Sequence, residues 1–410
     1  MQTSEPSHDI IIAGGGVVGA SLACALADAG LRVALIDARE PATDWPADSI
    51  DQRVYAITCA SQTLFERLGV WEGIRQRGVS PYQAMEVWDA AGPGRIHFDA
   101  AELGEPWLGH IVEQRVIQAA LLDGQRARPG LERLCPAELA DFHLDDAAGV
   151  SARLGDGREL AAALLVGADG AGSRVRELAG IGVETHDYEQ TAVVAVVASE
   201  RAHAGTARQR FLPTGPLAFL PLRDGRCSIV WSTTPLEAER LLALPDEEFC
   251  IELGQAFDYE LGAITRVSGR GGFPLRRLHA VDYVQQRLAL VGDAAHVIHP
   301  LAGQGVNLGL LDVAALAEVV ADTAAAGRDI GAHTNLRRYE RWRRGDNALM
   351  QSAMDGFKWL FASPLTPVRL LRNLGLGTVD RLPPLKSLLA RHAMGRAGDL
   401  PRLVRPDNRA

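Results

Sequence analysis

The chain has 410 residues, of which 47% are hydrophobic and 23% charged, and its formal net charge at pH 7 is −9. This length exceeds one typical domain of roughly 100–200 residues, so we expect two domains that share an interface. The negative charge argues against nucleic acid as the main partner, because phosphate binding needs a basic surface. No uninterrupted apolar run reaches about 18 residues, so no membrane span is expected, and the polar residues 1–8 do not resemble a signal peptide.

Five cysteines are scattered along the chain without a CxxC pair: Cys24, Cys59, Cys135, Cys227 and Cys250. An odd and scattered set is typical neither of a zinc site nor of a disulfide framework. We therefore expect small, buried, apolar side chains, no metal site and a reducing cytoplasm.

The N-terminal segment predicts the opening of a doubly wound parallel sheet. An apolar run at Asp9–Ala13 is followed at once by glycines, then by a helix of small residues at Ala20–Ala29, and then by a second apolar run at Arg32–Ile36. Strand, glycine turn, helix and strand in this order form the first unit of a dinucleotide-binding domain. Residues 40–52 are rich in Pro, Asp and Ala and are expected to form a loop.

The glycine turn carries the pattern G-x-G-x-x-G, with Val18 inside it. Gly14 permits a tight turn, Gly16 lets the backbone approach a pyrophosphate, and Gly19 lets helix and strand pack closely. The start of the helix presents free N–H groups and its positive dipole end to the phosphates. Asp37 ends the second strand, where an acid binds a ribose hydroxyl. The motif predicts dinucleotide binding but does not separate FAD from NAD.

Later segments predict further strands, an inserted domain and C-terminal helices. Apolar runs at Leu160–Val166 and Leu288–Val291 suit the parallel sheet, and Val306–Ala321 suits a long helix. Between them lie short β-rich runs separated by Gly, Pro and Asp: Ala192–Ala198, Leu217–Leu222, Cys227–Ser232 and Phe273–Leu275. We expect these to form a mainly antiparallel domain inserted into the first. From Arg337 onward the pattern is helical with proline breaks.

Two more motifs follow predicted strands. Asp169 and Gly170 stand in GADGAGSRVR, and Asp293 stands in GDAAH, which runs into HPLAGQGVNLG at residues 299–309. With the glycine turn, these motifs stand in the order typical of the aromatic-hydroxylase class of FAD monooxygenases, which the sequence resembles. The resemblance implies an α/β fold: a Rossmann-like FAD-binding domain, an inserted antiparallel substrate domain and C-terminal helices.

The resemblance also implies roles in FAD binding. Asp293 is placed to hydrogen-bond the ribityl chain, and the turn before Val306 can aim N–H groups at the flavin pyrimidine edge, which is anionic when reduced. Asp169 and Arg53 resemble the family's pair beside the pyrophosphate, although Arg53 also suits an ordinary surface arginine. Arg115 matches a position along the cofactor. The residues expected to bind FAD are Gly14, Gly16, Val18, Gly19, Asp37, Arg53, Arg115, Asp169, Gly170, Asp293, Pro300, Gly303, Gln304, Gly305, Val306 and Asn307. Gln114 replaces the usual asparagine, and its role stays open.

Longer stretches resemble the ubiquinone-biosynthesis hydroxylases, from about Asp9 to Leu376. Examples are His299–Asp312, Gly109–Leu121 and Phe219–Trp231. The resemblance implies that a flavin C4a-hydroperoxide hydroxylates the ring of a polyprenylated phenol, with dioxygen as co-substrate. Residues 84–89 and 393–395 favour the enzyme of the C5 step. Residues 215–231 and 249–265 also resemble the C1 enzyme, and the C6 step is a further alternative.

No catalytic side chain can be assigned firmly from the sequence. His299 and His296 are the ionisable residues nearest the flavin motifs, and each suits either a base for the phenol proton or a histidine that fixes the loop. A second dinucleotide cradle is absent, so the electrons come from NAD(P)H bound transiently or from a reductase protein. Rival classes are an NAD-dependent dehydrogenase, a non-catalytic flavoprotein scaffold of a biosynthetic complex, and an oxygenase of other aromatics.

The C-terminal residues 356–410 hold ten Lys/Arg and three Asp, together with apolar clusters. Basic helices with apolar faces suit a lipid surface, such as the periphery of the inner membrane, or a partner subunit of the biosynthetic complex. Helices packed on the FAD-binding domain are the equally open alternative. The oligomeric state stays open.

The expected domain organisation alternates between two domains. Residues 1–75, 111–185 and 281–345 are assigned to the FAD-binding domain, residues 76–110 and 186–280 to the substrate domain, and residues 346–410 to a C-terminal helical region.

Overall fold

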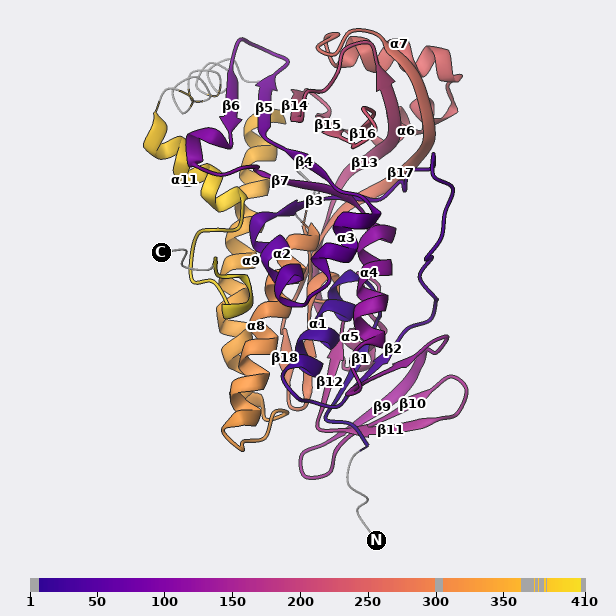
Figure 1. Ribbon diagram of the computed structural model, residues 1–410, viewed down its shortest axis with the longest axis vertical. Helices are drawn as coiled ribbons and strands as arrows, with labels where there is room; N and C mark the ends of the chain where they lie inside the picture. Colours follow the sequence, from indigo (N-terminus) through magenta and orange to yellow (C-terminus); the bar gives the residue numbers. More distant parts are fainter. Residues whose placement is uncertain are drawn as a thin grey trace.

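The structure, a computed structural model, describes residues 7–298, 305–362, 372, 375, 380 and 382–406. Its two halves are stacked along the longest axis (Figure 1). A parallel sheet with its helices forms the lower half, and a large, mainly antiparallel sheet forms the upper half. The predicted α/β architecture is confirmed: a Rossmann-like domain, an inserted antiparallel sheet and helices toward the C-terminus.

The lower half is built on a six-stranded sheet in the order β18-β19-β12-β1-β2-β8. All of its neighbouring pairs are parallel except β18–β19. The bounds are β1 Ile10–Ala13, β2 Val33–Ile36, β8 Leu131–Leu134, β12 Leu164–Gly167, β18 Val284–Gln285 and β19 Leu288–Leu290. The four residues of β1, β2 and β12 are all buried, as expected for parallel strands covered on both faces.

The two faces of this sheet are covered differently. Helices α1 (Val17–Asp28) and α4 (Gln114–Arg126) pack on one face, and a small antiparallel sheet, β9–β11, packs on the other. A doubly wound sheet would carry helices on both faces, so the expectation from the N-terminal segment holds for only one face. The bounds of the small sheet are β9 Leu139–Asp145, β10 Gly149–Leu154 and β11 Glu159–Ala162.

The small sheet also corrects one predicted strand. The apolar run Leu160–Val166 is divided between β11, which pairs with β10, and β12, which enters the parallel sheet. The chain changes partner at Ala163, whose N–H donates to the carbonyl of Asp9 instead of continuing the β10 ladder. An apolar run alone does not show where one strand ends and the next begins.

The upper half is an eight-stranded sheet in the order β20-β17-β13-β16-β15-β14-β5-β6, in which β14 and β5 pair in parallel. Its bounds are β5 Ala84–Asp89, β6 Arg95–Asp99, β13 Val183–Ser199, β14 Thr206–Leu212, β15 Gly215–Pro221, β16 Cys227–Thr233, β17 Ile264–Ala280 and β20 His296–Val297. The outer face is covered by α6 (Pro235–Ala243) and α7 (Asp246–Ala256). Strands β13 and β17 are longer than predicted and run down beside the lower half (Figure 1).

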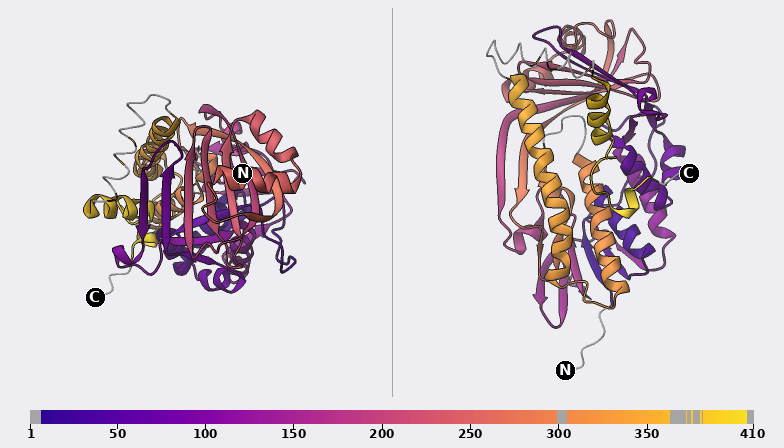
Figure 2. Two further views of the ribbon diagram at one scale, coloured as in Figure 1. Left: turned by 90° about the horizontal axis from the view of Figure 1, so that it is seen from above. Right: turned by 90° about the vertical axis from the view of Figure 1, so that its left-hand side faces the viewer.

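The remaining elements connect and cover these sheets. They are β3 Val54–Thr58, α2 Cys59–Arg67, α3 Trp71–Arg77, β4 Ser80–Tyr82, η1 Ala101–Leu103, β7 Gly109–Glu113, α5 Arg174–Leu178, η2 Gly292–Ala294, α8 Gly305–Ala325, α9 His333–Ala362, α11 Pro383–Ala393 and η4 Arg402–Val404. Strands β3, β7 and β4 form a third antiparallel sheet between the halves. The long helices α8 and α9 run side by side (Figure 2).

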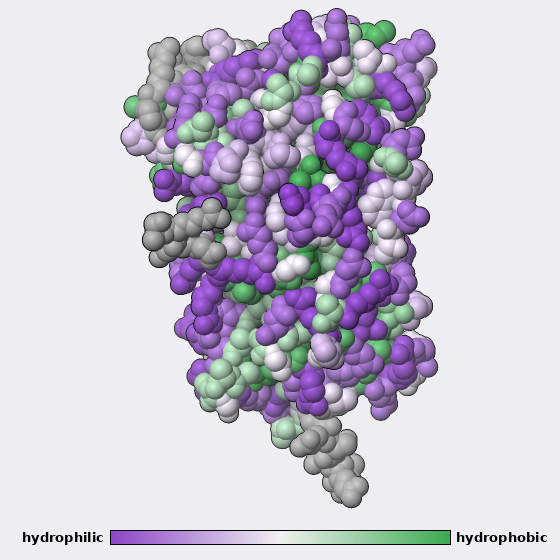
Figure 3. Space-filling model, viewed as in Figure 1, coloured by the Kyte–Doolittle hydropathy of each residue, from purple (hydrophilic) through white to green (hydrophobic). Residues whose placement is uncertain are grey.

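The surface and the thiols agree with the composition. The face in Figure 3 is mostly hydrophilic, with hydrophobic side chains scattered between polar ones. All five cysteines are free thiols, four of them buried. Within the described ranges, no helix has the length and apolar character needed to cross a bilayer, and no group of three side chains suits a metal ion.

A buried histidine makes the stability depend on pH. His110 of β7 is only 4% exposed, lies between the rings of Trp71 and Trp107 at 5.0 Å each, and its burial lowers the pKa from 6.5 to about 4. Between these two pH values the unfolded chain binds a proton that the folded chain does not. The free energy of unfolding should therefore fall as pH drops through this window, by about 3 kcal/mol in total.

Urea unfolding of the wild type and of His110→Phe at pH 7 and pH 4.5 measures this contribution. Between pH 7 and pH 4.5, the free energy of unfolding should fall by about 2–3 kcal/mol less in His110→Phe than in the wild type. His392→Phe, on the exposed surface of α11, serves as the control and should follow the wild type. Equal losses in all three proteins would contradict the assignment.

Candidate active site

A cavity of about 1480 Å³ lies between the parallel sheet and the inner face of the antiparallel sheet. Its lower wall is formed by residues at the carboxyl ends of β1, β2, β12 and β19, where ligands bind in open α/β sheets. Its upper wall is formed by β13 to β17. The volume exceeds the roughly 300–1,000 Å³ of a pocket for one small ligand, so a cofactor and a substrate can share it.

Packing explains two of the three motif glycines, and the cavity explains the third. Gly14 has a φ of +105°, and a Cβ there would overlap the carbonyl of Ala168. A Cβ on Gly19 would overlap the carbonyl of Gly14. A Cβ on Gly16, in contrast, would meet no atom within 4 Å, and Gly16 lines the cavity. This cradle at the start of α1 fits the pyrophosphate of a dinucleotide.

Asp37 lies against the glycine turn at the edge of the cavity. A Cβ on Gly15 would collide with its carboxylate, so glycine is required there for close approach. Burial raises the pKa of Asp37, although the N–H of Arg39 and the charge of Arg133 act in the opposite direction. The position at the end of β2 fits the ribose contact predicted from the sequence.

Asp169 presents an unused acceptor at the cavity. Its Oδ2 accepts a hydrogen bond from the N–H of Val175 at 3.0 Å, which ties the motif to the start of α5. Its Oδ1 is buried and has no partner in the described part of the chain. A ligand that donates a hydrogen bond here would satisfy this atom. Gly170 lines the cavity beside it with a φ of +82°.

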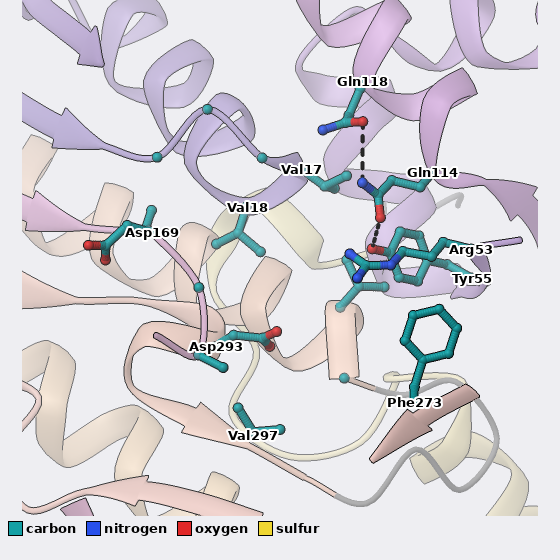
Figure 4. Close-up of a pocket in the computed structure, with 18 of the residues that line it drawn as sticks. Val17, Val18, Arg53, Tyr55, Gln114, Gln118, Asp169, Phe273, Asp293 and Val297 are labelled. Atoms are coloured by element: carbon teal, nitrogen blue, oxygen red, sulfur yellow. Dashed lines mark hydrogen bonds between the residues drawn. The ribbon is translucent and has the colours of Figure 1, made fainter. Parts of the chain in front are cut away.

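Arg53 lies across the cavity from Asp169, and Asp293 lies between them in the view of Figure 4. The side chain of Asp293, on η2, is accessible from the cavity, while the surrounding protein raises the pKa of its carboxyl by desolvation. The guanidinium of Arg53 lies 5.5 Å from the ring centre of Phe273. Arg53 and Asp169 therefore do not form a contacting pair, and the charge of Arg53 acts on Asp293 instead.

A hydrogen-bonded row of polar side chains was missed from the sequence. The hydroxyl of Tyr55 donates to Gln114 Oε1 at 2.7 Å, and Gln114 Nε2 donates to Gln118 Oε1 at 3.3 Å (Figure 4). All three line the cavity. The spacing of Gln114 and Gln118 at the start of α4 could have indicated a shared helix face. Nothing in the sequence pointed to Tyr55.

Arg115 lies outside the cavity lining and holds the loop before β3. Its guanidinium donates to the hydroxyl of Ser49 at 2.9 Å, pairs with Glu113, and lies 4.7 Å from the ring centre of Trp45. The position along the cofactor that the resemblance implied for Arg115 stays a prediction. Arg115 positions the loop that leads to Arg53.

The start of α8 supplies the last predicted contacts. Gly305 and Val306 line the cavity. Asn307 is buried beneath them, donates to the carbonyl of Ala56 at 2.8 Å, and accepts from Thr58 N at 3.0 Å. It anchors α8 to β3. Four predicted residues lie outside the described part of the chain: His299, Pro300, Gly303 and Gln304.

His296 takes part in a buried charge network that holds the Asp293 segment. Its Nε2 lies 2.5 Å from Asp312 Oδ2, which also accepts from Gly292 N at 3.1 Å. Arg343 of α9 donates to Asp312 Oδ1 at 2.9 Å. Burial acts to raise the pKa of Asp312, but His296 and Arg343 outweigh it and lower the pKa to about 2. Because His296 does not line the cavity, this geometry favours the loop-fixing interpretation over a base.

Comparison with known proteins identifies the family. The family model for the FAD binding domain matches residues 7–348. The ubiquinone hydroxylase UbiL of Rhodospirillum rubrum is 44% identical over 97% of this chain and 92% of its own length. The 3-demethoxyubiquinol 3-hydroxylase of Escherichia coli is 41% identical over 96% of this chain and 100% of its own length. The chain belongs to the ubiquinone-biosynthesis hydroxylase family of FAD-dependent monooxygenases.

Solved structures agree with this placement. The fold matches p-nitrophenol 4-monooxygenase PnpA of Pseudomonas putida with a TM-score of 0.77 and 19% identity, over 97% of this chain and 100% of that one. It also matches aklavinone-11 hydroxylase, solved with FAD and aklavinone, with a TM-score of 0.67 and 25% identity over 87% of this chain and 69% of that one. As a member of this family, the chain is an FAD-dependent monooxygenase, and the rival interpretation as an NAD-dependent dehydrogenase is wrong.

Proposed function

We propose that this hydroxylase replaces a ring hydrogen of a polyprenylated phenol by a hydroxyl group, whose oxygen comes from dioxygen while the second oxygen atom leaves as water. The observation that carries the proposal is the single cavity in which the dinucleotide cradle of Gly16 faces the inner wall of the antiparallel sheet. The names of the relatives, a ubiquinone hydroxylase and a demethoxyubiquinol hydroxylase, support a ring substrate of the ubiquinone pathway.

For the ring position we propose the C5 step, on the segments that resemble the C5 enzyme. The C6 step is the second candidate. The C6 step is supported by the name of the 41% identical relative, 3-demethoxyubiquinol 3-hydroxylase. The C1 step remains the third alternative from the sequence.

In the proposed mechanism, bound FAD supplies the oxygen chemistry and the chain supplies the site. Asp293, Asp169 and Gly16 line the lower wall and would hold the cofactor there, together with Gly305 and Val306 at the start of α8. The sheets on either side of the cavity limit the access of water. In a wet site the enzyme would release hydrogen peroxide instead of hydroxylated product. Electrons come from NAD(P)H bound transiently or from a reductase protein, since the sequence offers no second dinucleotide cradle.

The C-terminal helix α11 is proposed to meet a partner or a lipid surface while packed on the enzyme. Lys386 forms an ion pair with Glu102 at 2.7 Å, which fixes the helix to the body of the protein. Leu385, Leu388 and Leu389 are exposed on the same helix. The ion pair supports helices packed on the enzyme. The exposed leucines support an apolar outer face that can meet a partner or a lipid surface.

The test is a single-turnover reaction of the FAD-loaded enzyme. The protein is reduced, mixed with a short-chain prenylphenol and ¹⁸O₂, and the product is analysed by mass spectrometry and NMR. We expect one ¹⁸O atom in the product, in a new hydroxyl group on C5 of the ring. Asp293→Ala, which should lose FAD but keep its circular dichroism melting curve, is the inactive control. Peroxide release without a labelled product would instead support the flavoprotein scaffold.

A further inference from the structure

The inner face of the antiparallel sheet forms a pleated floor for the cavity. Because side chains alternate across a strand, Ala192 and Val194 of β13 face the cavity while Val193 packs in the core beneath α6 and α7. The same alternation places Ala218 of β15 on the cavity side and Phe219 in that core. Small and apolar side chains make most of the floor flat.

On the strands β13 to β16, three polar side chains interrupt this apolar floor: Gln209 of β14, and Ser228 and Ser232 of β16. Gln209 is 6% exposed, and each serine is 2% exposed. All three line the cavity, and their side chains have no hydrogen-bond partner among the described residues. Their polar atoms are open to the cavity rather than sealed in the core, so water or a ligand in the cavity can supply their hydrogen-bond partners.

The strand register shows how the three groups surround one area. Gln209 pairs with Ala218, and Ala218 pairs with Val230, so these residues form one row across β14, β15 and β16. Ser228 and Ser232 lie two residues to either side of Val230 on β16. They are roughly 13 Å apart along the strand, and a flat ring with its substituents fits between them.

The pleat also keeps positive charge off the part of the floor that β13 to β16 form. Arg208 and Arg210 flank Gln209 in the sequence but point away from the cavity, where Arg208 pairs with Glu86 and Arg210 donates to the carbonyl of Ala256. None of the residues that β13 to β16 contribute to the cavity is charged. Arg276 of β17, the strand on the far side of β13 from β16, does line the cavity.

We propose that Gln209, with Ser228 and Ser232, binds the oxygen substituents of an uncharged aromatic ring and excludes rings that carry a carboxylate. The inference rests on the proposed function, whose ring substrate it describes in more detail. The amide of Gln209 both donates and accepts, which suits a phenol hydroxyl or an ether oxygen. A carboxylate placed between Gln209, Ser228 and Ser232 would lose its hydration without meeting a cation on β13 to β16, which disfavours its binding there.

The test measures binding rather than turnover, from the change in flavin absorbance when the oxidised FAD-loaded enzyme is titrated. The probes are a short-chain prenylphenol and its para-carboxylated counterpart. We expect the wild type to prefer the prenylphenol. Gln209→Leu should weaken prenylphenol binding about tenfold, because one hydrogen bond to the ring is lost. Gln209→Arg should bind the carboxylated probe about tenfold more tightly than the wild type does.

The matched control is Gln125→Leu, the same substitution at a glutamine of α4 that is 5% exposed and lies outside the cavity lining. It should bind the prenylphenol like the wild type. Unchanged prenylphenol binding in Gln209→Leu would overturn this inference alone, whereas a wild type that binds no prenylphenol would count against the proposed function. If Gln209→Leu does not fold, Gln209→Asn replaces it: weakened binding supports the inference, and wild-type binding refutes it.

Discussion

Gly16→Val is expected to abolish FAD binding while leaving the fold intact. A Cβ at this position would meet no protein atom within 4 Å, and Gly16 lines the cavity, so we expect the apoprotein to accept the valine. The pyrophosphate needs this same space, because it must lie close to the backbone of Gly16. We expect the variant to be purified colourless, with no FAD bound after incubation with excess cofactor, and with the wild-type apoprotein's melting temperature.

Gly19 provides the contrast, three residues further along the same motif. Its Cβ would overlap the carbonyl of Gly14, so Gly19→Val should destabilise the apoprotein itself, in thermal unfolding monitored by circular dichroism without FAD. The two variants thus separate a glycine required by the ligand from a glycine required by packing. A Gly16→Val protein with normal flavin affinity would refute the placement of the pyrophosphate.

Asp312→Ala should destabilise the enzyme by about 3–5 kcal/mol, the usual cost of breaking a buried ion pair. Asp312 is fully buried and accepts from His296, Arg343 and the N–H of Gly292. Its removal leaves the guanidinium of Arg343 buried without its main partner. It also releases the segment that carries Asp293, so FAD should bind more weakly. Urea unfolding of the apoprotein and flavin titration measure the two effects separately.

Asp346→Ala is the matched control for this prediction. Asp346 pairs with the same arginine at 3.0 Å, but its side chain is 57% exposed, so its loss should cost at most about 1 kcal/mol. Equal effects of the two substitutions would show that the buried network contributes no more than a surface pair.

Much of the lower wall of the site could be predicted from the sequence because its signals are local. The glycine spacing before α1, the acid at the end of β2 and the two Asp motifs each follow an apolar strand directly. Since the carboxyl ends of parallel strands meet at one edge of the sheet, these segments converge once the strands are placed. The structure places Gly16, Asp37, Asp169 and Asp293 around one cavity, as that reasoning required.

The tertiary structure alone decided the contacts that depend on distant pairing or on exact register. Arg115 was expected along the cofactor from the sequence, but its contacts with Glu113 and Ser49, which hold it against the loop before β3, were visible only in the structure. The sequence left two interpretations of His296, a base for the phenol proton or a residue that fixes the loop. The structure favours the second, because Asp312 of α8 and Arg343 of α9 form a buried charge network with it. Gln209 carried no signal, because only the pairing of β14 with β15 decides whether Gln209 or its arginine neighbours face the cavity. Period-two alternation identifies two faces of a strand, but burial against a partner sheet determines which face receives the ligand.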